Sequence, residues 1–150
     1  MAEIKNRYTV RSQTTDLPGR TLNHARTNHW IIDSPSGPNE STTTGESFFS
    51  GMAACGVSLV ELYAQRNNMP FGTLTVSIDA VRTEEHWPEF AWIDVHFTYP
   101  GVSDEVASNL TEVWKENCPL YRAVAKGTTV NVDYEVKAGS EARQAVGASS

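Results

Sequence analysis

The chain has 150 residues, of which 39% are hydrophobic and 20% charged, and its formal net charge is −6. This length suits one domain whose core needs no metal or disulfide for stability, and the composition excludes collagen, coiled coil and wholesale disorder. Because polyphosphate repels an acidic surface, the charge argues against a nonspecific nucleic-acid binder.

The first half of the chain predicts two extended segments, a loop and a long helix. We expect a strand over residues 7–14, a turn at 16–19, and a second extended stretch that ends at residues 30–32. Ser, Thr, Gly and Pro predict a loop over 33–45. Apolar residues at helical spacing predict a helix over 46–65, and because it is apolar on nearly every side, we expect it to be buried.

The second half predicts three strands and a second helix. Apolar residues alternate over 74–80, 93–99 and 130–134, which is typical of half-buried strands. Ser103 is the expected N-cap of the second helix, which should end at Cys118 because Pro119 follows. The small and polar tail from Gly139 is expected to be disordered.

Together these elements predict an α+β fold with a mostly antiparallel sheet and a long, buried central helix. One domain would cover residues 1–138, and residues 139–150 would form the tail. The central helix is more apolar than a lone domain of this size easily buries. We therefore expect a homodimer in which the partner covers the other side of the helix.

Neither a membrane segment nor a secretory signal is expected. The longest mostly apolar run, residues 48–64, is shorter than the roughly 20 residues that span a bilayer, and the amino terminus lacks the apolar segment of a signal peptide. We therefore expect a cytoplasmic protein, in which the two cysteines do not form a permanent structural disulfide.

Cys55, within the central helix, and Cys118, where the second helix ends, are the candidate reactive groups. No metal site is expected, because the chain has no Cys-x-x-Cys pair and its four histidines lack ligand spacing. Cys55 is either a small core residue or a reactive thiol. A reactive thiol needs a neighbouring cation to lower its pKa from about 8.5; Arg11, Arg20 and Arg26 are the candidates, and each is otherwise a solvated surface residue.

Glu46, at the start of the central helix, has two interpretations. As a carboxylate at a helix N-terminus it stabilises the helix by about 0.3–1 kcal/mol. Alternatively, it holds an arginine in a bidentate pair that is aimed at the Cys55 thiol.

Two strings resemble the OsmC/Ohr family of osmotically inducible and organic-hydroperoxide-resistance proteins. The first contains His29, Asp33 and Pro35, followed by a loop and a helix that opens with glutamate and reaches Ala-Ala-Cys at position 55; the second is the Cys-Pro-Leu string at 118–120. The likeness covers residues 8–136. It implies an α+β fold that dimerises by intertwining, with the long helices at the centre and two active sites at the interface.

The resemblance also implies a peroxidase without cofactor or metal. Cys55 would attack an organic hydroperoxide and become a sulfenic acid, and Cys118 would resolve it to a disulfide. A dithiol reductant, in the family typically a lipoylated protein, would regenerate the thiols. Of the activating arginines, Arg26 is the leading candidate, since it lies nearest the His-Asp-Pro string, and Arg20 is the alternative.

An apolar substrate pocket would favour alkyl or lipid hydroperoxides over hydrogen peroxide. Its expected lining is Phe48, Phe49 and Met52, which are core residues in the alternative interpretation.

The helix start departs from the characterised peroxidases of that family. It reads Thr-Gly-Glu instead of Asn-Pro-Glu, and Glu46 precedes Cys55 by nine residues instead of ten. One residue rotates a helical side chain by about 100°, so the arginine clamp does not follow automatically. A binding protein that keeps the fold, holds a small apolar ligand and has little peroxidase turnover is therefore the alternative. A hydrolase that uses Ser50 or Ser58 is a third hypothesis, although no Gly-x-Ser-x-Gly elbow supports it.

Overall fold

The computed structural model describes residue 3 and residues 5–139. The chain divides into two compact units, Met1–Phe48 (unit 1) and Phe49–Ser150 (unit 2), and each is described by itself. Residues 140–150, most of the expected tail, lie outside the described residues. The expectation of one domain over 1–138 stays a prediction.

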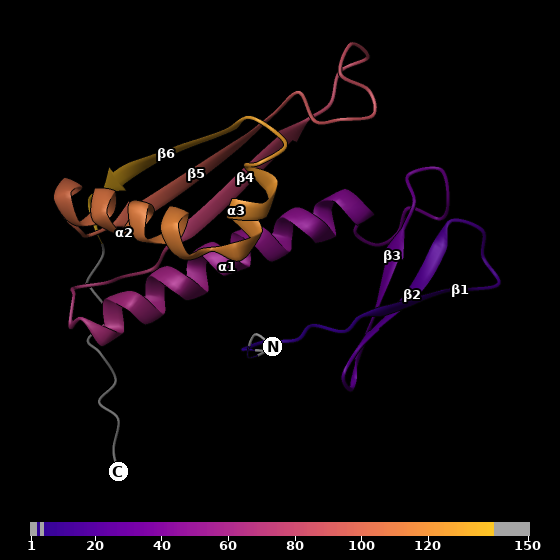
Figure 1. Cartoon of the computed structure of the whole chain (residues 1–150), viewed down its shortest axis with the longest axis horizontal. Coiled ribbons are helices and arrows are strands. Elements are labelled where there is room, and N and C mark those ends of the chain that lie inside the picture. Colours follow the sequence, from indigo (N-terminus) through magenta and orange to yellow (C-terminus); the bar gives the residue numbers. More distant parts are fainter. Residues whose placement is uncertain (1–2, 4, 140–150) are drawn as a thin grey trace. The chain divides into compact units, whose positions relative to one another are not determined.

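Unit 1 is a three-stranded antiparallel sheet in the order β1 (Arg11–Thr14), β2 (Arg20–Ala25) and β3 (Asn28–Asp33) (Figure 1). The first strand is shorter than predicted, and the second extended stretch is in fact a hairpin of two strands. The hairpin turns at Arg26, whose φ is 57°. Tight hairpin turns with positive φ favour Gly, Asn or Asp, so an arginine there gave no turn signal in the sequence.

The turn between β1 and β2 packs its backbone against the loop that follows β3. Gly19 has a φ of +83°, and a Cβ atom on it would lie 2.8 Å from the Cα of Gly37. The backbone N–H of Ser34 donates to the Gly19 carbonyl at 2.7 Å. Only glycine satisfies both the conformation and the close approach at position 19.

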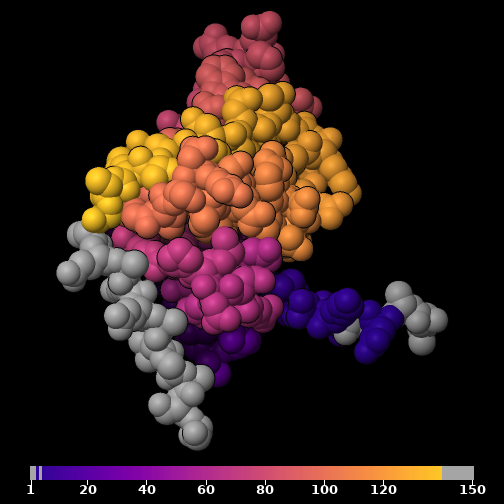
Figure 2. Space-filling model, turned by 90° about the vertical axis from the view of Figure 1, so that its left-hand side faces the viewer, coloured from indigo at the N-terminus to yellow at the C-terminus, as the bar shows by residue number. Residues whose placement is uncertain are grey.

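The predicted central helix is α1 (Thr44–Arg66). Its buried residues recur every three or four positions and form one face: Phe49, Met52, Gly56, Val60 and Ala64. Other positions keep exposed apolar side chains, with Leu62 50% exposed, and Figure 2 shows magenta surface of α1 that α2 and α3 leave uncovered. Within one chain the helix is thus buried along one face, and its cover by a partner subunit stays a prediction.

By length and composition alone, α1 is also the one described helix that could cross a membrane. It has 23 residues and an 18-residue window of mean hydropathy 1.3, so the helix is longer than the apolar run over 48–64 that it contains. Core helices of globular proteins pass the same test. Here Gly56 lies against Val76 and Phe97 of the sheet, so this apolar face of α1 is part of the protein core.

Unit 2 contains a second sheet in the order β4 (Thr75–Val81), β5 (Trp92–Pro100) and β6 (Val130–Lys137). β4 and β5 pair antiparallel, whereas β5 and β6 pair parallel. Alternate residues of β5 enter the core with at most 1% exposure: Ile93, Val95, Phe97 and Tyr99. The α+β class and the mostly antiparallel pairing are confirmed, but the strands form two sheets of three.

Helix α2 (Asp104–Asn117) packs on the same sheet face as α1, because its Trp114 ring lies 4.9 Å from the Phe97 ring. Ser103 is its N-cap, as predicted, and accepts a hydrogen bond from the Val106 N–H. α2 ends before Cys118, yet a further helix, α3 (Pro119–Val124), starts at once. Proline suits the first position of a helix as well as the end of one, so the sequence predicted the stop and missed the start.

Candidate functional site

The two cysteines, 63 residues apart in sequence, meet in unit 2. The Sγ atoms of Cys118 and Cys55 lie 3.0 Å apart, with the Cys118 thiol donating to the Cys55 sulfur, and both cysteines are free thiols. A disulfide bond is about 2.05 Å long. A small approach of the two sulfurs would therefore allow a reversible dithiol–disulfide couple.

Local structure positions Cys118 through both its backbone and its sulfur. Its backbone N–H donates to the Trp114 carbonyl at 2.8 Å and closes α2, while its Sγ accepts from the Tyr121 N–H at 3.4 Å and caps α3. Cys118 is fully buried and Cys55 partly so, and both belong to the packing of the hydrophobic core. The thiol pair thus lies between the middle of one helix and the junction of two others.

Burial, and next the hydrogen bond and charge of Cys118, raise the pKa of Cys55 to about 12. None of these causes is a cation. The thiolate is the nucleophilic form, and reactive cysteines owe it to a nearby positive charge or dipole. Among the described residues, unit 2 by itself therefore keeps the Cys55 thiol protonated.

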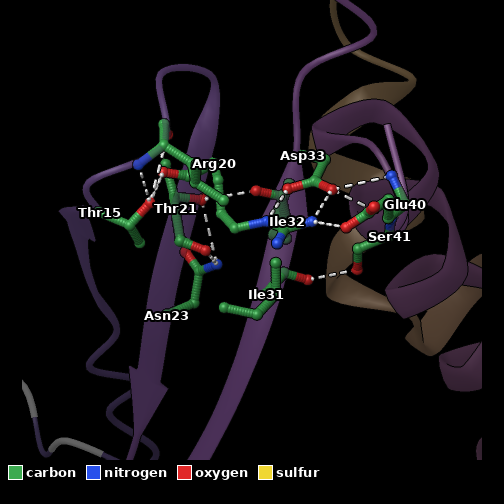
Figure 3. A network of polar contacts seen from close by, with 10 residues as sticks. Thr15, Arg20, Thr21, Asn23, Ile31, Ile32, Asp33, Glu40 and Ser41 are labelled. Atoms are coloured by element: carbon green, nitrogen blue, oxygen red, sulfur yellow. Dashed lines mark hydrogen bonds and ion pairs between the residues drawn. The ribbon is translucent and has the colours of Figure 1, made fainter. Parts of the chain in front are cut away.

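Unit 1 holds an arginine between two carboxylates, and Figure 3 shows how they face one another. The Arg20 Nε donates to Asp33 Oδ1 at 2.8 Å, and its Nη2 donates to Asp33 Oδ2 and to Glu40 Oε2, both at 2.8 Å. Asp33 is fully buried and also accepts from the backbone N–H groups of Glu40 and Ser41. This geometry is the bidentate pair that orients a guanidinium most strongly.

These contacts also set the charges of the Arg20 site. The hydrogen bond from Arg20 comes first among the causes that hold the pKa of Asp33 at about 2, and the backbone N–H groups of Glu40 and Ser41 add to it against the effect of burial. In turn, the hydrogen bonds to Asp33 and Glu40 raise the pKa of Arg20. Arg20 is therefore a permanent, fixed cation.

The pairing of Arg20 with Asp33 escaped the sequence, although each was named for another reason. The two are cross-strand partners in the register of β2 and β3, so the pair becomes visible only once the hairpin is recognised. Glu40 lies in the loop after β3 and carried no signal. Arg26, the leading candidate from the sequence, lies exposed in the hairpin turn.

Glu46 contacts the residue before α1. Its carboxylate accepts from the Thr43 N–H at 2.7 Å and from the Thr43 hydroxyl at 2.8 Å, and its own N–H donates to the Thr43 Oγ1 at 3.3 Å. This is a capping box, which stabilises the helix start, and these bonds lower the pKa of Glu46. The described contacts of Glu46 therefore match its helix-start interpretation.

The three expected substrate-contacting residues differ in environment. Met52 is fully buried and Phe49 is 8% exposed, with its ring 5.1 Å from that of Phe90, so both lie in the core of unit 2. Phe48 is 51% exposed. A cavity of about 670 Å³ lies instead at the β4–β5 connection, the projection at the top of Figure 2, lined by Arg82, Thr83, Glu84 and Trp87.

The described histidines contact one another or nearby polar side chains. His24 and His29 pair with each other through their Nδ1 atoms at 2.7 Å, His86 contacts Thr83, and His96 contacts Asp133. Ser58 is exposed on α1. In the part of the chain that the structure describes, no group of three His, Cys, Asp or Glu residues could hold a metal ion.

Comparisons with known proteins agree with this architecture. The model of the family described as OsmC-like protein matches residues 37–133. An OsmC-like protein from Mycoplasma pneumoniae superposes with a TM-score of 0.80 at 14% identity, over 89% of this chain and 99% of that one. No curated protein matches the sequence.

Two further solved structures share the fold. An organic hydroperoxide resistance protein OsmC from Legionella pneumophila has a TM-score of 0.69 at 17% identity, over 90% of this chain and 99% of that one. An organic hydroperoxide resistance protein from Elizabethkingia anophelis has a TM-score of 0.68 at 21% identity, over 89% and 100%.

Proposed function

The chain belongs to the OsmC-like protein family, and from this premise we propose that it is a thiol-dependent peroxidase that reduces organic hydroperoxides to alcohols. The observation that carries the proposal is the 3.0 Å separation of the Cys55 and Cys118 sulfurs. The names of the solved relatives, which include organic hydroperoxide resistance proteins, support a redox role.

The proposed cycle uses both sulfurs. The Cys55 thiolate attacks the outer peroxide oxygen, the O–O bond breaks, and the alkoxide takes a proton and leaves as the alcohol. Cys55 is then a sulfenic acid. The Cys118 thiol attacks that sulfur, a water molecule leaves, and a disulfide forms. A dithiol reductant restores both thiols by exchange and becomes a disulfide itself.

The proposal requires a cation beside Cys55 in the working protein, because burial alone keeps this thiol protonated. Arg20 and Arg26 are the candidates. The contacts favour Arg20, since Asp33 and Glu40 fix its guanidinium, whereas Arg26 lies in an exposed turn. Arg20→Gln and Arg26→Gln, compared in one peroxidase assay, distinguish them. Substitution of the arginine that activates Cys55 should lower the rate constant for Cys55 oxidation by about tenfold or more.

The first experiment is a titration of the reduced protein with cumene hydroperoxide and with hydrogen peroxide, followed by free-thiol assay and intact mass. We expect rapid loss of two thiols per chain and a mass decrease of about 2 Da, as disulfide formation requires, faster with the organic peroxide. Cys55→Ser should consume no peroxide. Cys118→Ser should complete one turnover and leave a sulfenic acid that dimedone traps; a normal disulfide in that variant would show that Cys118 is not the resolving residue.

The alternative is a small-ligand-binding protein with the same fold and little peroxidase turnover. The raised pKa of Cys55 favours it. The pH dependence of Cys55 alkylation by iodoacetamide separates the two functions. For the binding protein, the rate should rise about tenfold per pH unit up to the highest pH at which the protein stays folded. For the peroxidase, it should reach a plateau near neutral pH.

A further inference from the structure

Helix α3 is a short element that depends on Cys118. It has six residues, none of them buried. Its first turn is tied to Cys118 twice, because the Tyr121 N–H donates to the Cys118 sulfur at 3.4 Å and the Arg122 N–H donates to the Cys118 carbonyl at 3.1 Å. The Tyr121 ring also lies 4.7 Å from the Trp114 ring.

The Cys118 sulfur therefore contacts both the Cys55 sulfur and the Tyr121 N–H, and disulfide formation changes both contacts. The sulfurs must approach by about 1 Å to reach bonding distance. Cys55 sits in the middle of the 23-residue helix α1, next to the buried Gly56. Cys118 sits at the junction of α2 and α3, so any movement of its sulfur toward Cys55 changes the contact of that sulfur with the Tyr121 N–H.

The contact between Tyr121 and the sulfur cannot follow that movement without a shift of α3. Sulfur is a weak acceptor, and at 3.4 Å the contact is already long. Withdrawal of the sulfur toward Cys55 leaves the Tyr121 N–H without its cap. The first turn then keeps the backbone bond from Arg122 to Cys118 and the contact of the Tyr121 ring with Trp114, but it loses the side-chain cap that the Cys118 sulfur gives it.

We propose that α3 is a redox-controlled cover over the Cys118 sulfur. The Cys118 thiol caps α3 in the reduced protein, and α3 is released when Cys118 joins Cys55 in a disulfide. Cys118 is fully buried in the reduced state. Release of α3 gives a dithiol reductant access to its sulfur after oxidation. The inference takes the disulfide from the proposed function but needs none of its peroxide chemistry.

Hydrogen exchange of the full chain, read by mass spectrometry, tests the proposal. Diamide serves as the oxidant: it takes two electrons and two protons from the thiols and becomes a hydrazine, while the S–S bond forms. We expect the amides of residues 120–125 to exchange about fivefold faster or more after oxidation, the size of an N-cap loss, while those of α2 do not change. In Cys55→Ser, diamide should leave α3 exchange unaltered.

Two variants separate the cap from the disulfide. Cys118→Ser keeps an N-capping side chain, whereas Cys118→Ala has none, and neither can form the disulfide. Without any oxidant, Cys118→Ala should show the fast α3 exchange of the oxidised wild type. Cys118→Ser should show the slow exchange of the reduced wild type.

The outcomes separate this proposal from the peroxidase. A disulfide with unchanged α3 exchange overturns the cover and leaves the peroxidase intact. Fast α3 exchange after diamide in a protein that does not consume hydroperoxide supports the cover and overturns the peroxidase. Failure of diamide to link the two cysteines overturns both.

Discussion

Asp33 shows how one side chain joins a strand, a loop and an arginine. It accepts two bonds from Arg20 and two from the backbone of the loop after β3. Its pKa is about 2 in the folded chain, below the ordinary value near 3.9. A carboxylate with a depressed pKa stabilises the fold above its unfolded pKa, and this contribution is lost as the pH falls through the folded value.

We therefore expect acid to weaken unit 1 between about pH 4 and pH 2. Asp33→Asn should remove that dependence and lower the stability at neutral pH, because the amide cannot neutralise Arg20. Denaturation curves of both proteins from pH 2 to 7 measure the effect. Identical acid slopes for the two proteins would contradict this role of Asp33.

Two histidines should give pH dependences of opposite sign. Burial, then the charges of Arg11 and His29, lower the pKa of His24. The hydrogen bond to Asp133 comes first among the causes that raise the pKa of His96, and Glu135 adds to it. Below about pH 6.5, protonation thus favours the unfolded chain at His24 and the folded chain at His96.

The substitutions His24→Gln and His96→Gln test these signs through chemical denaturation from pH 5 to 8. Relative to the wild type, His24→Gln should gain stability toward pH 5, because it removes a cost of protonation. His96→Gln should lose stability toward pH 5, by less than about 1 kcal/mol since its ion pairs are exposed and screened. Equal responses of both variants would contradict the assignment.

At the scale of elements, the turn before β2 depends on glycine backbone geometry. Gly19→Ala places a Cβ atom 2.8 Å from the Gly37 backbone at a φ of +83°. We expect a loss of about 1–3 kcal/mol in the free energy of unfolding. Gly45→Ala is the matched control: its Cβ meets nothing within 4 Å and it lies in α1, so it should be neutral or stabilising by up to about 1 kcal/mol in denaturant titrations.

For the whole molecule, the uncovered apolar side of α1 leads us to expect a homodimer. Sedimentation should give twice the 16.5 kDa of one chain, and a stable monomer would contradict the expectation. Leu62 is 50% exposed on this helix. Leu62→Lys should weaken the dimer by about tenfold or more, because burial of a leucine contributes about 1.5–3 kcal/mol. Thr75→Lys adds the same charge at an exposed position on the sheet face opposite α1 and should leave the dimer intact.

The sequence by itself determined the elements whose signals are local. Side-chain periodicity gave α1, α2 and the strands of unit 2, and the Ser103 cap and the break at Cys118 followed from adjacent residues. Burial of one face of a helix or strand imposes that periodicity on consecutive residues, so no tertiary contact is needed to recognise it.

Only the tertiary structure decided which distant groups meet. It pairs Arg20 with Asp33, 13 residues away, and Cys118 with Cys55, 63 residues away. It also sets β6 parallel to β5 and turns a hairpin at Arg26. These features depend on the turns and crossover connections that bring distant segments of the chain together. The residues next to a given residue in the sequence do not specify which distant residue it will contact.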